Sequence, residues 1–145
     1  MIKTVSLETA KQLKEAGYPQ GYEYALLNYY KNDAGEEITS RGYTDMELFL
    51  GGSNWEKICA APTAEDILDQ LPVVIDTKDP RGAFELVITK HHQKQNQYGV
   101  LYTKPFLGNL HTDDQHFTLE ERQYNESLAE SAAKMYLYLK KEELI

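Results

Sequence analysis

The sequence predicts an α+β fold: an antiparallel β-sheet with short helices and a C-terminal helix packed on one face. Three observations lead to this prediction. Segments between residues 73 and 102 alternate as strands do, two short segments carry helix caps, and an apolar helix lies near the C-terminus. We expect residues 1–145 to form a single domain, because this is a usual length for one.

Two short helices are predicted from their caps. Ser6 can accept a hydrogen bond from the first turn of a helix, and Gly17 suits the left-handed position that follows a helix end. Thr63 caps the second helix in the same way, and Pro72 ends it. The apolar residues of the two helices recur at helical spacing: Leu7, Ala10 and Leu13 in the first, and Ile67, Leu68 and Leu71 in the second.

The strands are clearest after the second helix. Residues 73–78 form an apolar run, and Asp79-Pro80-Arg81-Gly82 has the composition of a type I turn. Alternation then marks two half-buried strands. We therefore expect a three-stranded antiparallel meander in which Phe84, Leu86 and Ile88 face the core, and in which Tyr98, Val100 and Tyr102 alternate with other residues on the next strand.

Earlier strands are less regular. Residues 22–30 are predicted to be a strand, with Tyr22, Tyr24 and Leu26 on one side, and residues 31–35 a polar turn. The stretch 38–60 is ambiguous, although 43–50 and 55–60 have strand composition.

The C-terminal region offers two possible helix starts. Thr118 with Glu121, and Ser127 with Glu130, both have capping-box spacing, so 118–141 is either one helix or two. After Ser127, apolar residues cover about half of the helix circumference. The remaining polar stripe is expected to hold Glu130, Ser131, Lys134 and Lys141, with Glu130 and Lys134 as an i,i+4 pair.

Charge and cysteine content exclude several classes of protein. The net charge is −8 and the isoelectric point is near 5.0, which disfavours nucleic acid and anionic membranes as partners. A single cysteine, Cys59, allows no internal disulfide and no cysteine-based zinc cluster, as is typical of a reducing cytosol. We find no signal peptide and no apolar run long enough to cross a membrane, and we expect a cytoplasmic protein.

No catalytic or metal-binding constellation is predicted. His91 and His92 are adjacent, so in a strand they would point to opposite faces. A denser group lies in an expected loop, which we interpret as solvated and metal-free: His111, Asp113, Asp114 and His116. Cys59 has apolar neighbours and is interpreted as a small buried hydrophobe. We expect no metal and no cofactor.

Three segments together resemble small uncharacterised proteins encoded in phages and prophages of gut bacteria. They are Val5–Gly17 (VSLETAKQLKEAG), Ala61–Pro72 (APTAEDILDQLP) and Ser127–Leu139 (SLAESAAKMYLYL), about a quarter of the chain. Members often have tryptophan before the Leu-Pro pair, where this chain has Gln70. The resemblance implies a phage or mobile-element origin and a bacterial host cell, and it implies no activity.

Tyrosine is the one residue type in excess, with 11 Tyr against 4 Phe and 1 Trp. Its apolar ring and polar hydroxyl suit half-exposed contact surfaces. We therefore expect a non-enzymatic accessory protein that binds another protein or itself, with candidate contact residues Tyr22, Tyr24, Tyr29, Tyr30 and Tyr43. The alternative is a small-molecule-binding protein or an unrecognised enzyme, using a tyrosine-lined pocket or the His111–His116 loop.

Overall fold

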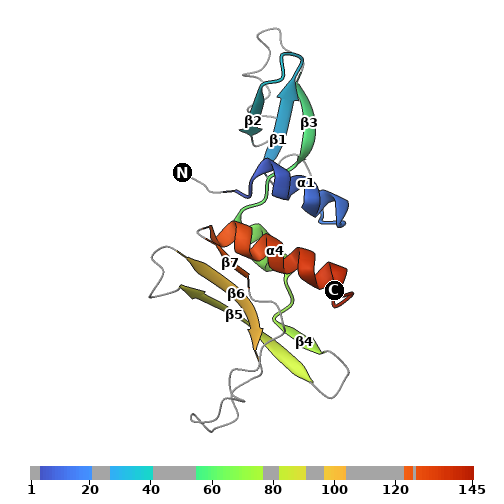
Figure 1. Ribbon diagram of the computed structural model, residues 1–145. Coiled ribbons are helices and arrows are strands. Elements are labelled where there is room, and N and C mark those ends of the chain that lie inside the picture. Colours follow the sequence, from blue (N-terminus) through green and yellow to red (C-terminus); the bar gives the residue numbers. More distant parts are fainter. Residues whose placement is uncertain are drawn as a thin grey trace.

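The computed structural model describes residues 4–20, 27–40, 55–76, 82–90, 97–103, 123–125 and 127–145. Figure 1 labels most of its elements. The helices are α1 (Leu7–Glu15), α3 (Ala64–Gln70) and α4 (Leu128–Lys141). The strands are β1 (Asn28–Asn32), β2 (Glu37–Ser40), β3 (Trp55–Ala60), β4 (Val74–Asp76), β5 (Ala83–Lys90), β6 (Tyr98–Thr103) and β7 (Gln123–Asn125).

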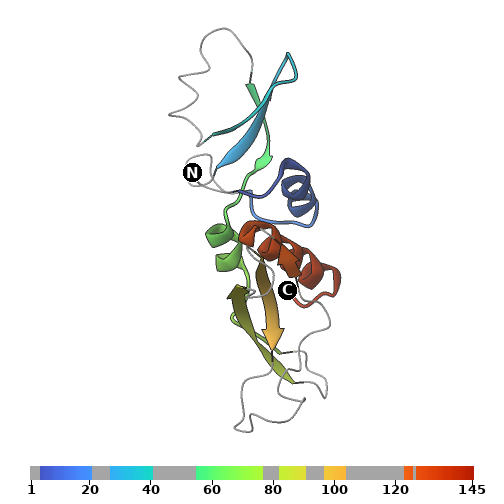
Figure 2. The same ribbon diagram turned by 60° about the vertical axis from the view of Figure 1, so that its left-hand side comes forward.

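The α+β class is confirmed, but the strands form two antiparallel sheets where the sequence led us to expect one. The first sheet has the order β2-β1-β3 and the second the order β4-β5-β6-β7. Figures 1 and 2 show the helices lying between the two sheets. The chain leaves β3 and forms α3 before it starts β4, so α3 separates the strands of the two sheets.

The first two predicted helices are confirmed, and so are their caps. The Ser6 hydroxyl accepts a hydrogen bond from the Thr9 backbone N–H at the start of α1, and Gly17 adopts a φ of 88° just after its end. At the start of α3, Thr63 and Asp66 form a complete capping box, in which each side chain accepts from the other residue's backbone N–H.

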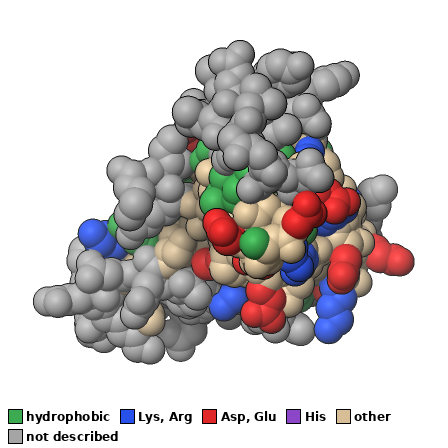
Figure 3. All heavy atoms as spheres, turned by 90° about the horizontal axis from the view of Figure 1, so that it is seen from above, with side chains coloured by type: hydrophobic (Ala, Val, Ile, Leu, Met, Phe, Trp, Pro, Cys, Tyr) green, Lys and Arg blue, Asp and Glu red, His purple; other side chains and the backbone are tan. Residues whose placement is uncertain are grey.

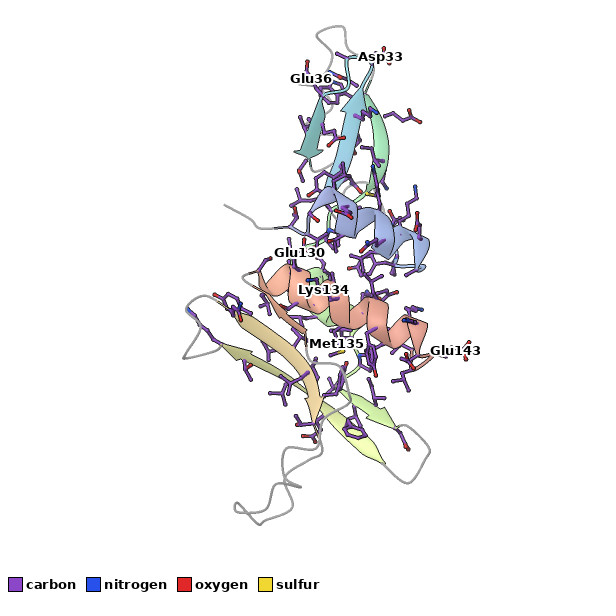
Figure 4. All side chains as sticks on the ribbon, viewed as in Figure 1. Asp33, Glu36, Glu130, Lys134, Met135 and Glu143 are labelled. Atoms are coloured by element: carbon purple, nitrogen blue, oxygen red, sulfur yellow. The ribbon has the colours of Figure 1, made fainter. Side chains whose placement is uncertain are left out.

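The cap of α1 is completed by a residue of another helix. The position that usually supplies the second half of a capping box holds Thr9, which has no carboxylate. Instead, the Ser6 N–H donates to Oε1 of Glu130 over 2.5 Å, and the Thr9 hydroxyl donates to Oε2 over 2.7 Å. Figure 4 shows Glu130 at the end of α4 that lies beside α1. One carboxylate therefore joins the N-termini of two helices.

Helix α4 begins where Ser127 was expected to cap it, since the Ser127 hydroxyl accepts from the Glu130 N–H. Residues 123–125 are a strand, so a continuous helix over 118–141 is excluded. One part of the predicted polar stripe was wrong. Ser131 is fully buried, and its hydroxyl donates to the Tyr98 carbonyl of β6 over 2.8 Å. A buried serine is tolerated here because that bond satisfies its hydroxyl.

The first sheet differs from the prediction in its turn. Lys31 and Asn32 belong to β1, so the turn starts at Asp33. The Asn32 side chain accepts from the N–H groups of Ala34 and Glu36, which fixes that turn. The predicted strand 55–60 is confirmed as β3. The segments 22–26 and 43–50 lie outside the described residues.

The predicted meander is confirmed as β4, β5 and β6, with β7 added beyond β6. On β5, Phe84 is buried and Leu86 packs at the margin of the core. The expectation that Ile88 also faces the core was wrong, because its side chain is 46% exposed. Helix α4 packs on β6 and β7, and Ile88 lies on the next strand, where the helix does not cover it.

We predict that Glu130→Ala lowers the free energy of unfolding by about 1–3 kcal/mol, because it removes a charged acceptor from two donors at the start of α1. The control is Lys134→Ala, an exposed position one turn further along α4 (Figure 4), which should change it by less than about 0.5 kcal/mol. Denaturant titration measures both. Equal midpoints for the two variants would contradict the bridging role of Glu130.

Candidate contact surface

Two of the five tyrosines expected at a contact surface are described by the structure. Tyr30 is buried, with 3% of its surface exposed, so it has almost no area to offer a partner. Tyr29 is half-buried and packs against the core. Its hydroxyl donates to the Val5 carbonyl over 2.5 Å and lies 3.3 Å from the Thr4 hydroxyl oxygen. Tyr29 thus holds the N-terminal segment against the first sheet. Tyr22, Tyr24 and Tyr43 lie outside the described residues.

Other tyrosines belong to the core. Tyr18 and Tyr136 meet edge to face, with ring centroids 5.2 Å apart. Burial raises the pKa of the Tyr18 hydroxyl, with further contributions from Asp66, Tyr136 and Asp69, and burial also raises the pKa of Tyr136. These hydroxyls therefore stay protonated at neutral pH and do not act as bases there.

The structure confirms Cys59 as a small buried side chain. Burial raises the pKa of its thiol and outweighs the opposing influence of Lys14, Lys11 and Lys57. A protonated, enclosed thiol is a poor nucleophile.

The four histidines, including those of the His111–His116 loop, lie outside the described residues. Within the described ranges, no group of three or more His, Cys, Asp or Glu side chains is arranged to hold a metal ion.

Large exposed apolar side chains gather on the second sheet. Among the residues that the structure describes, these are Val73 at 72%, Val74 at 50% and Ile88 at 46% exposure. Leu86, which is half-buried, lies between them, because its N–H donates to the Val73 carbonyl and Ile88 follows it by two residues. We call these four residues, Val73, Val74, Leu86 and Ile88, the β4 corner.

The β4 corner exposes apolar groups on both faces of a sheet edge. Val74 is paired with Glu85, and alternation places both on the face opposite to Phe84 and the core. Leu86 and Ile88 lie on the same face as Phe84, and the continued register puts Val73 there as well. Apolar groups on both faces of an edge are unusual on a surface that meets only water.

The corner is held in place by bonds to the core. The Tyr102 hydroxyl donates to the Pro72 carbonyl over 2.6 Å, and burial raises the pKa of that hydroxyl, so it remains a donor. Leu71 is buried just before it, and Ile75 is buried just after Val74. The exposed valines therefore lie between fixed neighbours, which lowers the entropy lost when a partner binds.

Among the described residues, the exposed charged side chains that share a face of the sheet with Val74 are acidic. Asp76 and Glu85 are exposed and share a face with Val74. The positive charge of Lys90 lies on the other face, 5.6 Å from the Tyr98 ring centre. At the opposite end of the molecule, Figure 3 shows acidic and basic side chains interspersed over the described surface.

The sequence contains a signal for this corner in its adjacent valines. Val73 and Val74 directly follow Leu71-Pro72, at the start of the run 73–78 that the sequence predicts to be an apolar strand. A strand at the edge of a sheet buries only the residues that face the core, which here leaves Ile75 alone.

No protein-family model, curated protein or solved structure matches the chain. The phage origin implied by the resemblance therefore stays a prediction. Of the helices in the described residues, none is both long enough and apolar enough to span a membrane.

We predict that substitutions at two positions of β5 differ strongly in their effect on the free energy of unfolding. Phe84→Ala should lower it by about 3–5 kcal/mol, because it leaves a cavity in the hydrophobic core, where Phe84 is fully buried. Ile88→Thr, on the same face of the same strand, should lower it by less than about 1 kcal/mol, because its side chain is already half in water. Thermal or urea denaturation measures both, and a large loss for Ile88→Thr would show that something covers this residue.

Proposed function

We propose that this chain acts by binding another protein and has no catalytic step of its own. The observation that carries the proposal is the β4 corner, where Val73, Val74 and Ile88 are exposed around a fixed sheet edge. The fully buried core of a protein interface is more apolar than its rim, so exposed apolar side chains at a fixed sheet edge are suited to that position. Leaving them exposed in the free protein invites aggregation, and a partner that covers them gives a physical reason to retain them.

The kind of partner follows from charge. A net charge of −8 repels nucleic acid and anionic lipid, so we propose a protein partner. The wider setting that we propose is that of a phage-type accessory protein in the cytoplasm of a bacterial host. Tyr22, Tyr24 and Tyr43 remain candidate contact residues. Tyr29 and Tyr30 are engaged within the protein and do not enter the proposal.

The proposal is tested with a surface variant that carries Val73→Thr, Val74→Thr and Ile88→Thr. Threonine keeps the β-branched shape and removes apolar area. Immobilised wild-type chain should retain a specific protein from a lysate of the producing cell, or should self-associate in sedimentation velocity, and the triple variant should lose this behaviour while its stability changes little.

The matched control carries Lys31→Ser, Glu37→Ser and Thr39→Ser, three exposed positions of the first sheet. It should behave as the wild type. Equal capture and equal association by wild type and triple variant would contradict the assignment of the β4 corner as the contact surface. A monomer that retains nothing at all would contradict binding as the function.

A further inference from the structure

β4 is the outermost strand of the second sheet, and one of its two edges pairs with no other described strand. The hydrogen bond from the Leu86 N–H to the Val73 carbonyl sets the phase of the antiparallel ladder, so Val73 and Ile75 direct their backbone groups toward β5. By the same alternation, the N–H and C=O of Val74 point away from β5. Within the described residues, β4 pairs with β5 alone. Val74 thus offers one donor and one acceptor in the plane of the sheet.

Devices that usually block a sheet edge are sparse on β4. Protective features include a very short edge strand, charged side chains (lysine above all), proline on the edge and a bulge that twists the edge away. The described strand Val74–Asp76 contains no lysine, no proline and no bulge, although it is short. Its one charged residue is Asp76, which lies on the same face as Val74 and Glu85.

The charge of this face selects the partner. A strand laid beside β4 would place alternate side chains next to Val74 and Asp76 on one face, and next to Val73 and Ile75 on the other. Basic residues among the first set would lie on the face that carries the exposed Glu85, one strand away, while apolar β-branched residues would extend the contact with the valines. The net charge of −8 also attracts a basic segment from a distance and repels a second copy of this chain.

From these observations we infer that β4 accepts an extended segment of a basic partner protein, which adds to the second sheet as a fifth strand and alternates apolar with Lys or Arg side chains. This inference rests on the proposed function and specifies its partner. Backbone hydrogen bonds to Val74 supply part of the affinity, and the alternation of basic and apolar side chains supplies specificity.

The test uses a fluorescein-labelled short peptide in which valine and threonine alternate with lysine, and its binding is followed by fluorescence anisotropy on the full chain. We expect saturable binding that weakens as salt is raised. A peptide with glutamate in place of lysine should not bind. A peptide with N-methyl groups along one edge should bind at least about tenfold more weakly, because it has lost donors for strand pairing.

Two variants of the protein, each of which adds one positive charge, locate the binding site of the peptide. Val74→Lys places a positive charge on the edge itself and should weaken peptide binding at least about tenfold. Thr39→Lys adds the same charge at an exposed position of β2 in the first sheet, outside the β4 corner, and its affinity should stay within about threefold of the wild type. Equal affinities for these two variants, or equal binding of the N-methylated peptide, would overturn the inference.

The outcomes also separate the inference from the function on which it rests. If no peptide binds, but the wild type captures a partner that the triple threonine variant loses, then strand addition fails and protein binding stands. If the chain instead forms a dimer that Val74→Lys abolishes, the occupant is a second copy and the basic partner is ruled out. If nothing is captured and no self-association occurs, the proposed function itself fails.

Discussion

The burial of α4 is the constraint on which the other elements depend. Seven of its 14 residues are buried, and they point in several directions: toward α3, toward β6 and β7, and toward α1. Ala129, Ala132 and Ala133 let neighbouring elements approach closely, while Met135, Tyr136 and Leu139 fill the space between them. In Figures 1 and 2 this helix lies at the middle of the molecule, between the two sheets. Each sheet is small, and packing against a helix is one of the ways in which a small sheet becomes stable.

The first sheet is joined to this centre by fewer contacts, and several are polar. Helix α1 packs on β3 and on α4, so it links them. Its N-terminus is completed by the carboxylate of Glu130, and the Tyr29 hydroxyl holds the preceding segment at Val5. Directional bonds of this kind fix the position of α1 more closely than apolar contact alone. The hydrophobic core cluster runs through the same region, from Val5 and Cys59 to Val100 and Tyr102.

Local rules predicted the parts of this fold that local interactions decide. The caps at Ser6, Thr63 and Ser127 depend on neighbouring residues, and all three helices start where predicted. Errors arose where a distant element decides. Glu130 and Ser131 looked like solvent-facing residues because periodicity cannot show that α1 and β6 lie against them. Ile88 looked buried because alternation identifies a face and does not show how far a helix covers it. For the same reason, the tyrosine count did not distinguish contact residues from Tyr18 and Tyr30, which are buried. The β4 corner was missed because alternation does not show which apolar residues a neighbouring element covers.

Because α1 and α4 lie between the two sheets, we expect both sheets to unfold as parts of one cooperative unit, with the β4 corner at its outer edge. The chain's single tryptophan, Trp55, lies on β3 and reports on the first sheet, whereas far-ultraviolet circular dichroism reports mainly on the helices between the sheets. Equilibrium denaturation followed by both signals on the same samples tests the claim most directly. Our account predicts that the two transitions coincide in midpoint and slope. An earlier loss of the Trp55 signal, with the helical signal intact, would show that the first sheet unfolds by itself and would contradict it.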